Sequence, residues 1–222
     1  MIDAYIIYLS KFPNSVSSAN KLVTQLKEVD INPILFEGSY GDEAEKEFEQ
    51  NNRHVHSWGI KGPIPNHKKM RYKSPGIIGC FLSHYRLWQK CVELNKPIMI
   101  FEDDASIIRP YYDVEFEDVL SLVFSHSKKM AKYIHYLEAS EGTPEAKFYK
   151  QTSMPGNAGY FIKPHAAKIL VDEYKNSFLP ADNAINQKLV KIEIHSHMMG
   201  KAVPREKYLG KTSIIKSHLF KV

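Results

Sequence analysis

The sequence predicts an α/β protein in which a central, mostly parallel sheet is flanked by helices. The run from Ala4 to Leu9 is apolar and rich in β-branched and aromatic residues, which is typical of a buried strand. An amphipathic pattern over 17–29 predicts a helix, and residues 32–36 predict a second strand. This order of strand, helix and strand begins a right-handed crossover and therefore a parallel sheet.

A second helix and strand follow each other further along the chain. Ser74 and Pro75 are typical of a helix start, and the pattern continues to Leu94 with aromatic residues on one face. The apolar run over 98–101, bounded by Pro97, is too short for a helix and predicts a strand buried on both faces.

The remaining chain alternates between short elements and loops. From 53 to 73 the composition turns to His, Gly, Pro and Lys without periodicity, which predicts a long loop. The other expected elements are helices over 42–51, 116–130 and 164–174, strands over 133–137, 159–162 and 192–197, an irregular segment over 142–154 and a short helix capped by Asp182. We interpret residues 1–222 as a single domain.

Composition limits the class of protein. No apolar run approaches the roughly 18 to 20 residues of a membrane span, and the N-terminus lacks a secretory pattern, so we expect a cytoplasmic protein. Cys80 and Cys91 would lie roughly 16 Å apart on one helix, beyond the reach of a disulfide. Both are therefore expected to be free thiols.

The net charge of +5 is distributed unevenly. No carboxylate lies between Glu49 and Glu93, and a second basic excess follows Glu193. Such stretches favour phosphate, nucleic acid or an acidic membrane surface, although a solvated basic face is the alternative. Because the chain carries no helix-turn-helix, zinc or RNA-binding pattern, we expect no nucleic-acid partner.

Three adjacent carboxylates follow the strand over 98–101. Glu102, Asp103 and Asp104 lie where ligands bind in open α/β sheets, outside the carboxyl end of a strand. Because like charges repel and resist desolvation, they require a cation or a full water shell, and a divalent metal is the obvious cation. The alternative is a turn that caps the next helix.

Four short motifs occur in a set order: residues 79–84 (GCFLSH), 102–104 (EDD), 159–162 (GYFI) and 180–182 (PAD). In this order they resemble glycosyltransferase family 25, the lipooligosaccharide biosynthesis glycosyltransferases, from the first strand to about Gln187. The resemblance implies a GT-A-like nucleotide-sugar-binding fold with a donor-binding half over 1–110 and an acceptor half over 111–222. It also implies an inverting mechanism with UDP-galactose as donor and a bacterial surface glycolipid as acceptor.

The resemblance and the chemistry together suggest a metal site. A divalent cation stabilises the charge that develops on a departing diphosphate, and hard oxygen ligands suit Mn²⁺ or Mg²⁺. In an acid-x-acid motif, Asp104 would ligate the metal, Glu102 would hold the ribose or a metal-bound water, and Asp103 would point to the sugar or the backbone. His195 or His197 would supply a further ligand, unless both histidines merely line a strand.

Other residues are expected around the donor and acceptor. Glu37 closes the second strand, where an acid can hydrogen-bond a ribose or base, and Leu9, the last residue of the first strand, is expected on the nucleotide side. Ser83, near the start of its helix, is expected to reach a phosphate, with a structural role as the strong alternative, and a structural role is favoured for His84. Gly159 and Tyr160 are expected to shape the acceptor side.

An inverting transfer needs a base that takes the proton of the acceptor hydroxyl. Asp182 matches the acid of the family at this position and would begin a helix, where its charge is stabilised. The alternative for Asp182 is a pure N-cap.

Two departures from the family pattern leave a second function open. Ile77 stands where the family usually has an acid, and Leu9 is followed by Ser10 and Lys11 rather than by an asparagine and arginines. The alternative is therefore a degenerate member that binds nucleotide or glycan without turnover. The active enzyme would work in the cytoplasm, with peripheral association with an anionic inner membrane as an option suggested by the basic stretches.

Overall fold

The computed structural model describes residues 1–59, 61–124, 142–148, 153, 154, 156 and 158–202. Its centre is a seven-stranded sheet in the order β10-β13-β8-β11-β6-β1-β2. The strands are β1 (Asp3–Tyr8), β2 (Asn32–Glu37), β6 (Ile98–Glu102), β8 (Val119–Ser121), β10 (Ala146–Phe148), β11 (Gly159–Ile162) and β13 (Ile192–His195).

Most of the central strands run in one direction. β1 is parallel to both β2 and β6, and β13 is parallel to β8. β11 is antiparallel to its two neighbours, β6 and β8, and β10 is antiparallel to β13, so five strands point one way and two the other. The predicted mixed α/β fold with a mostly parallel sheet, as in GT-A-like proteins, is confirmed.

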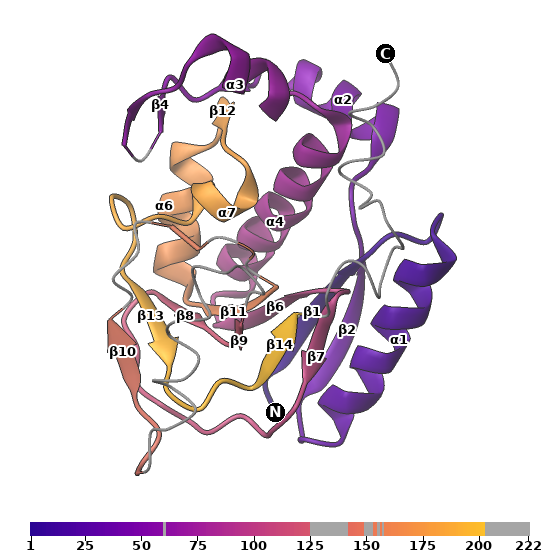
Figure 1. Cartoon of the computed structure of the whole chain (residues 1–222), viewed down its shortest axis with the longest axis vertical. Coiled ribbons are helices and arrows are strands. Elements are labelled where there is room, and N and C mark those ends of the chain that lie inside the picture. The colour runs from indigo at the N-terminus through magenta and orange to yellow at the C-terminus, as the bar shows by residue number, and fades with distance from the viewer. Residues whose placement is uncertain (60, 125–141, 149–152, 155, 157, 203–222) are drawn as a thin grey trace.

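Helices cover both faces of the sheet. The long helix α4 (Pro75–Leu94) packs with α6 (Pro164–Glu173), and Figure 1 shows both above the strands, whereas α1 (Pro13–Lys27) lies apart from them beside β2. Residues of β6 alternate between the two cores: Ile98 and Ile100 pack in the cluster that contains α4, and Met99 and Phe101 pack in the cluster that contains α1. This alternation explains why the run is apolar without interruption.

The helix predicted from Pro75 to Leu94 is confirmed, and so are the strands of β1, β2, β6 and β11. The first helix begins four residues earlier than predicted, at Pro13, because proline suits the first turn of a helix. Helix α2 (Gly41–Gln50) also matches, and it packs against α4 through an ion pair between Glu47 and Arg86.

The predicted loop over 53–73 contains short elements. These are β3 (His54–Val55), β4 (Trp58–Gly59), β5 (Gly62–Pro63) and α3 (Asn66–Tyr72). β3 pairs with β12 (Ser177–Phe178), and β4 forms a hairpin with β5. The loop prediction was wrong for α3 because that helix buries none of its residues and so has no apolar periodicity.

The helix predicted over 116–130 is also wrong in its described part. Residues 119–121 form β8, and β9 (Val123–Phe124) follows immediately. Val119 to Val123 are buried throughout, and periodicity alone cannot separate a short buried strand from a buried helix. The rest of that helix and the strand predicted over 133–137 lie outside the described residues.

Two smaller features complete the fold. The segment expected to be irregular over 142–154 contains β10 at the edge of the central sheet. A three-stranded sheet in the order β7 (Ala105–Ile107), β14 (Gly200–Ala202) and β9 lies apart from the central sheet in its pairing. Within the described part of the chain, no helix is both long enough and apolar enough to cross a membrane.

Candidate active site

The acidic residues gather at the carboxyl edge of three adjacent parallel strands. Glu102 is the last residue of β6, and Asp103 and Asp104 form the turn that leads into β7. The register pairs Ile7 of β1 with Glu102, and Tyr8 with Glu37 at the end of β2. Leu9, Glu37 and the three acids therefore lie along the same edge, as the strand pattern predicted.

Two serines hold this edge in place. The backbone N–H and hydroxyl of Ser10 both donate to Glu37 Oε1, at 2.9 and 3.0 Å. Ser15, fully buried in the first turn of α1, accepts a hydrogen bond from the Leu9 N–H at 2.8 Å and donates to Asp103 Oδ2. Ser15 was not among the residues predicted from the sequence, because its only signal is a polar residue at the start of a helix that follows a strand.

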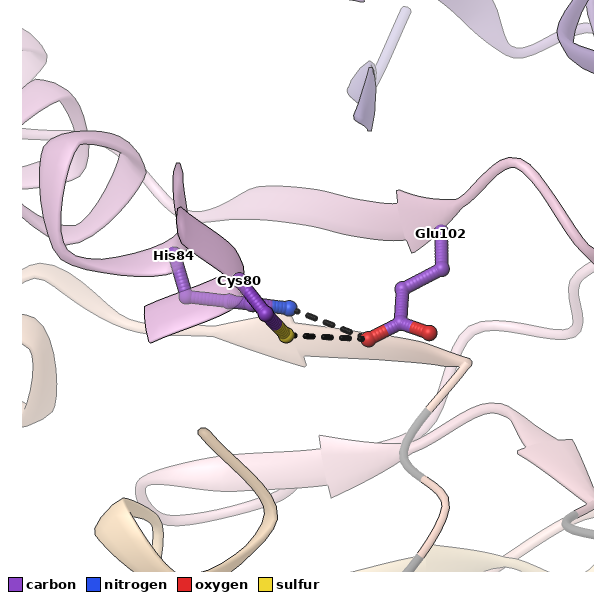
Figure 2. Close-up of side chains that lie close together, drawn as sticks. All are labelled: Cys80, His84 and Glu102. Atoms are coloured by element: carbon purple, nitrogen blue, oxygen red, sulfur yellow. Dashed lines mark hydrogen bonds and ion pairs between the residues drawn. The ribbon is translucent and has the colours of Figure 1, made fainter. Parts of the chain in front are cut away.

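A second group of side chains converges on Glu102 from α4. Figure 2 shows Cys80 Sγ and His84 Nε2 directed at the same carboxylate oxygen, Glu102 Oε1, at 3.8 and 3.3 Å. Cys80 and His84 lie one helical turn apart, so they project from the same face of α4. The His84 side chain is 1% exposed and that of Glu102 is 30% exposed, so the group runs from the core to the surface.

Hydrogen bonds behind His84 determine its orientation. The Trp88 indole N–H donates to the Tyr160 hydroxyl at 2.8 Å, and this hydroxyl lies 2.9 Å from His84 Nδ1. Because an indole nitrogen is a donor only, the consistent assignment has Tyr160 donating to Nδ1 and His84 Nε2–H donating to Glu102. Burial lowers the pKa of His84 to about 4, against the opposing effect of the Asp182 charge, so the ring is neutral at neutral pH.

Gly159 and Tyr160 have interior roles rather than a place on an open acceptor face. Tyr160 is fully buried, and its hydroxyl belongs to the network of His84 and Trp88. A Cβ at Gly159 would lie 2.5 Å from side-chain atoms of both Phe101 and Val123. The glycine is therefore required by the close packing around it in the interior.

Ser83 also has a structural partner where a phosphate contact was expected. Its hydroxyl donates to the Gly79 carbonyl at 2.7 Å and accepts from the Ser39 N–H at 2.9 Å, and the residue is 1% exposed. A Cβ at Gly79 would lie 2.2 Å from the Ser39 carbonyl oxygen. The GCFLSH motif thus fastens α4 to the segment after β2 and presents Cys80 and His84 to Glu102.

Asp182 lies in α7 (Ala181–Ala184), close enough to α4 for its charge to act on His84. It is not the N-cap, a position occupied by Pro180. Its Oδ2 accepts a hydrogen bond from the Gly156 N–H at 2.8 Å, and its carbonyl accepts one from the Met154 N–H at 3.1 Å. The half-buried carboxylate is therefore held in a fixed direction by backbone outside its own helix.

The two histidines at the end of β13 differ from each other. His195 is fully buried, with Nε2 2.6 Å from the Tyr112 carbonyl and Nδ1 accepting the His197 N–H at 3.0 Å. Burial lowers the pKa of His195, and neither ring nitrogen is left for a metal in this arrangement. His197 lies in the turn after the strand, edge-on to the Tyr112 ring at 5.6 Å.

Only one group of three potential metal ligands converges among the described residues, and it consists of Cys80, His84 and Glu102. The predicted combination of Asp104 with His195 and His197 does not form such a group there. A Mg²⁺ or Mn²⁺ ion beside Asp104 would therefore need its remaining ligands from substrate phosphates and water, which is how such ions are commonly held.

Comparison with known proteins identifies the family. The sequence profile of glycosyltransferase family 25 (LPS biosynthesis protein) matches residues 1–185. The chain is a member of glycosyltransferase family 25. The region of this family 25 protein that the profile matches contains α4, the acidic edge after β6 and Asp182, and it ends before β13, β14 and the two histidines His195 and His197.

Individual relatives are distant. Lipooligosaccharide biosynthesis protein lex-1 of Haemophilus influenzae is 28% identical over 152 residues, which cover 59% of this chain and 48% of the relative. A glycosyltransferase 25 family member of Anopheles gambiae is 29% identical over 58% of this chain and 23% of the relative. The procollagen lysyl hydroxylase and glycosyltransferase of Acanthamoeba polyphaga mimivirus is 25% identical over 82% and 21%, respectively. The chain thus spans about half or less of the length of these relatives.

The buried His84 predicts a defined pH dependence of stability. In the unfolded chain the imidazole takes up a proton near pH 6.5, whereas in the folded protein its pKa is about 4. The free energy of unfolding should therefore fall by on the order of 3 kcal/mol as pH is lowered from 6.5 to 4, and His84→Gln should remove this component. Denaturant unfolding at a series of pH values, with a chelator present, measures the difference between the two proteins.

The matched control is His67→Gln on the exposed face of α3, which should leave the wild-type slope intact. A difference between wild type and His84→Gln that stays constant across this pH range would contradict the assignment.

Proposed function

We propose that this protein is an inverting glycosyltransferase that moves galactose from UDP-galactose onto a lipooligosaccharide or lipopolysaccharide core acceptor. The observation that carries the proposal is the acidic edge formed by Glu37, Glu102, Asp103 and Asp104 at the ends of three parallel strands in a family 25 chain. The choice of acceptor is supported by the resemblance to a relative named as a lipooligosaccharide biosynthesis protein.

Glu37 and Leu9 form the nucleotide end of the proposed donor site. Glu37 is exposed at the end of β2, and one of its oxygens is oriented by both hydrogen bonds from Ser10. An exposed, oriented carboxylate at a strand end suits the hydroxyl groups of a ribose. Leu9 lies beside it, with its backbone N–H anchored on Ser15, so the base and ribose would meet a fixed segment of chain.

The acids after β6 form the diphosphate end. Asp104 would hold Mn²⁺ or Mg²⁺, and Glu102 and Asp103 would orient a metal-bound water and the sugar. Oxygen ligands in a short turn fit such hard cations, which use one or two carboxylates together with phosphate oxygens. When bound, the cation supplies stabilisation of the negative charge that develops on the leaving diphosphate.

Asp182 would act as the base that takes the proton of the attacking acceptor hydroxyl. The Gly156 N–H holds Oδ2 in place, which restricts the carboxylate to one orientation. A positioned base of this kind contributes about 100- to 10,000-fold to the rate. Inversion requires the acceptor hydroxyl to attack the sugar on the face opposite the leaving group, so Asp182 would take the proton on that face.

A basic surface on α3 and the neighbouring segment supports the proposal that the protein binds an anionic membrane. On α3 and the segment beside it, Lys61, Lys68, Arg71 and Lys73 are exposed. Two large apolar side chains accompany them: Trp58 is 58% exposed and Met70 is 77% exposed. Basic residues next to exposed aromatic and apolar side chains favour peripheral binding at a lipid headgroup layer. The proposed location is therefore the cytoplasmic face of a bacterial inner membrane.

The second candidate function is a degenerate family member that binds nucleotide or glycan without turnover. Ile77 favours it, since the residue that stands in place of an acid packs against the core cluster around α4. Turnover that depends on Asp182 would exclude this candidate.

A panel of UDP-sugars with Mn²⁺ tests the activity, with donor hydrolysis and transfer as the readouts. UDP-galactose should be consumed faster than UDP-glucose or UDP-N-acetylglucosamine. Asp182→Asn should lower kcat by about 100- to 10,000-fold with little change in KM, because a general base acts on proton transfer in the transition state and not on substrate binding. Asp172→Asn, an exposed substitution on α6, is the control and should leave kcat within about twofold of wild type.

Equal activity of wild type and Asp182→Asn would contradict the assigned base, and no turnover of any UDP-sugar by wild type would favour the degenerate member.

Sedimentation with anionic phospholipid vesicles tests the membrane surface. Replacement of both Lys68 and Arg71 by glutamate should weaken vesicle binding by at least tenfold, at about 1 kcal/mol for each basic residue near the surface. The same change of charge on α1, at Lys21 and Lys27, is the control and should weaken binding much less. Equal losses from both double variants would show that net charge rather than this surface is responsible.

A further inference from the structure

We infer that Cys80, His84 and Glu102 form a binding site for a Zn²⁺-class transition-metal ion. Their ligand atoms, Sγ, one imidazole nitrogen and a carboxylate oxygen, all lie within 4.8 Å of one another. Figure 2 shows that the three side chains point at a common position from two elements, α4 and the end of β6. The proposed donor site uses neither the thiol nor the imidazole, and the two sites share only Glu102.

The distances fit a tetrahedral ion with small movements of the side chains. Metal bonds of about 2.0 to 2.3 Å place neighbouring tetrahedral ligands roughly 3.3 to 3.6 Å apart. Glu102 Oε1 lies 3.3 Å from His84 Nε2 and 3.8 Å from Cys80 Sγ. The backbone already holds the ligands in place, because Cys80 and His84 are one turn apart on a long buried helix.

The surroundings of His84 suit a metal ligand. The Tyr160 hydroxyl lies 2.9 Å from Nδ1, and a partner on the second nitrogen is what orients metal-binding imidazoles. On binding, the ion takes the place of the proton on Nε2, the ring proton moves to Nδ1, the Tyr160 hydroxyl turns from donor to acceptor toward Nδ1, and the Cys80 thiol releases its proton to solvent. The site reaches the surface on its Glu102 side, where the side chain is 30% exposed, and this provides a path for entry.

The donor set determines the class of ion. A thiolate and an imidazole select Zn²⁺ or Co²⁺, whereas Mg²⁺ and Mn²⁺ prefer oxygen ligands. Three protein ligands leave a fourth position for water or another small ligand. The ion would also hold the Glu102 carboxylate, so occupancy of this site would compete with any role of Glu102 at the donor site.

The decisive experiment is a titration of the full chain with Co²⁺ in the absence of nucleotide, so its outcome does not depend on the transferase activity. Binding to the cluster should produce the thiolate-to-cobalt charge-transfer absorption at one equivalent of Co²⁺, and Zn²⁺ should abolish it by displacement. Cys80→Ser should remove the charge-transfer band, and Glu102→Gln should weaken Co²⁺ binding by at least about tenfold.

Cys91 provides a matched control, because it is the second of the two cysteines of the chain, lies on the same helix and is fully buried. Cys91→Ala should keep the band, with circular dichroism confirming that each variant is folded. A band of equal strength in Cys80→Ser, or no band in folded wild-type protein, would overturn the inference and leave the cluster as a hydrogen-bonded anchor between α4 and β6.

Discussion

The contact between buried His84 and Glu102 is the constraint on which the arrangement of the site depends. It joins the middle of the long helix α4 to the last residue of the central strand β6 at 3.3 Å. Tyr160 and Trp88 support it from within the core, so β11, β6 and α4 are tied together by one line of hydrogen bonds. Inside a protein such a network is strong when every member has a partner, and costly when one is missing.

The packing around this contact explains the small residues of α4. Gly79 allows the helix to approach the backbone at Ser39, and Ser83 then bridges the two segments. The close approach brings Cys80 and His84 to Glu102 and leaves the acidic turn at the edge shared with β1 and β2. On the other face of the sheet, Ser15 of α1 holds Asp103, so helices from both layers position the acids.

Local sequence patterns were sufficient to predict the helices and strands whose apolar residues mark directly which positions are buried. The helix over 75–94 has a proline at its start and an apolar face, and β6 is apolar at every position except its last. Patterns failed where burial depends on distant partners. Residues 119–123 are buried throughout, so their apolar run fits a buried helix as well as a strand, and the exposed helix α3 has no apolar stripe to reveal it.

The same distinction applies to the site. The acidic edge was predictable because strand order fixes where carboxyl ends meet, and the GCFLSH motif was recognisable as a unit. The directions of three other side chains were not predictable, because their hydrogen-bond partners are distant in the sequence. Ser83 contacts Ser39, 44 residues away, Tyr160 contacts His84, 76 residues away, and His195 contacts Tyr112, 83 residues away. Residue type suggested ligands for phosphate, acceptor and metal, whereas tertiary contacts turn these three side chains toward the core.

We propose that a cation at the acidic edge helps this family 25 chain to hold a nucleotide diphosphate. Calorimetric titration of UDP with and without Mn²⁺, on wild type and Asp104→Asn, measures this contribution. We expect Mn²⁺ to strengthen UDP binding at least tenfold in wild type and to have little effect in Asp104→Asn, since that carboxylate would hold the ion. UDP affinity that is the same with and without Mn²⁺ in the wild-type protein would contradict it.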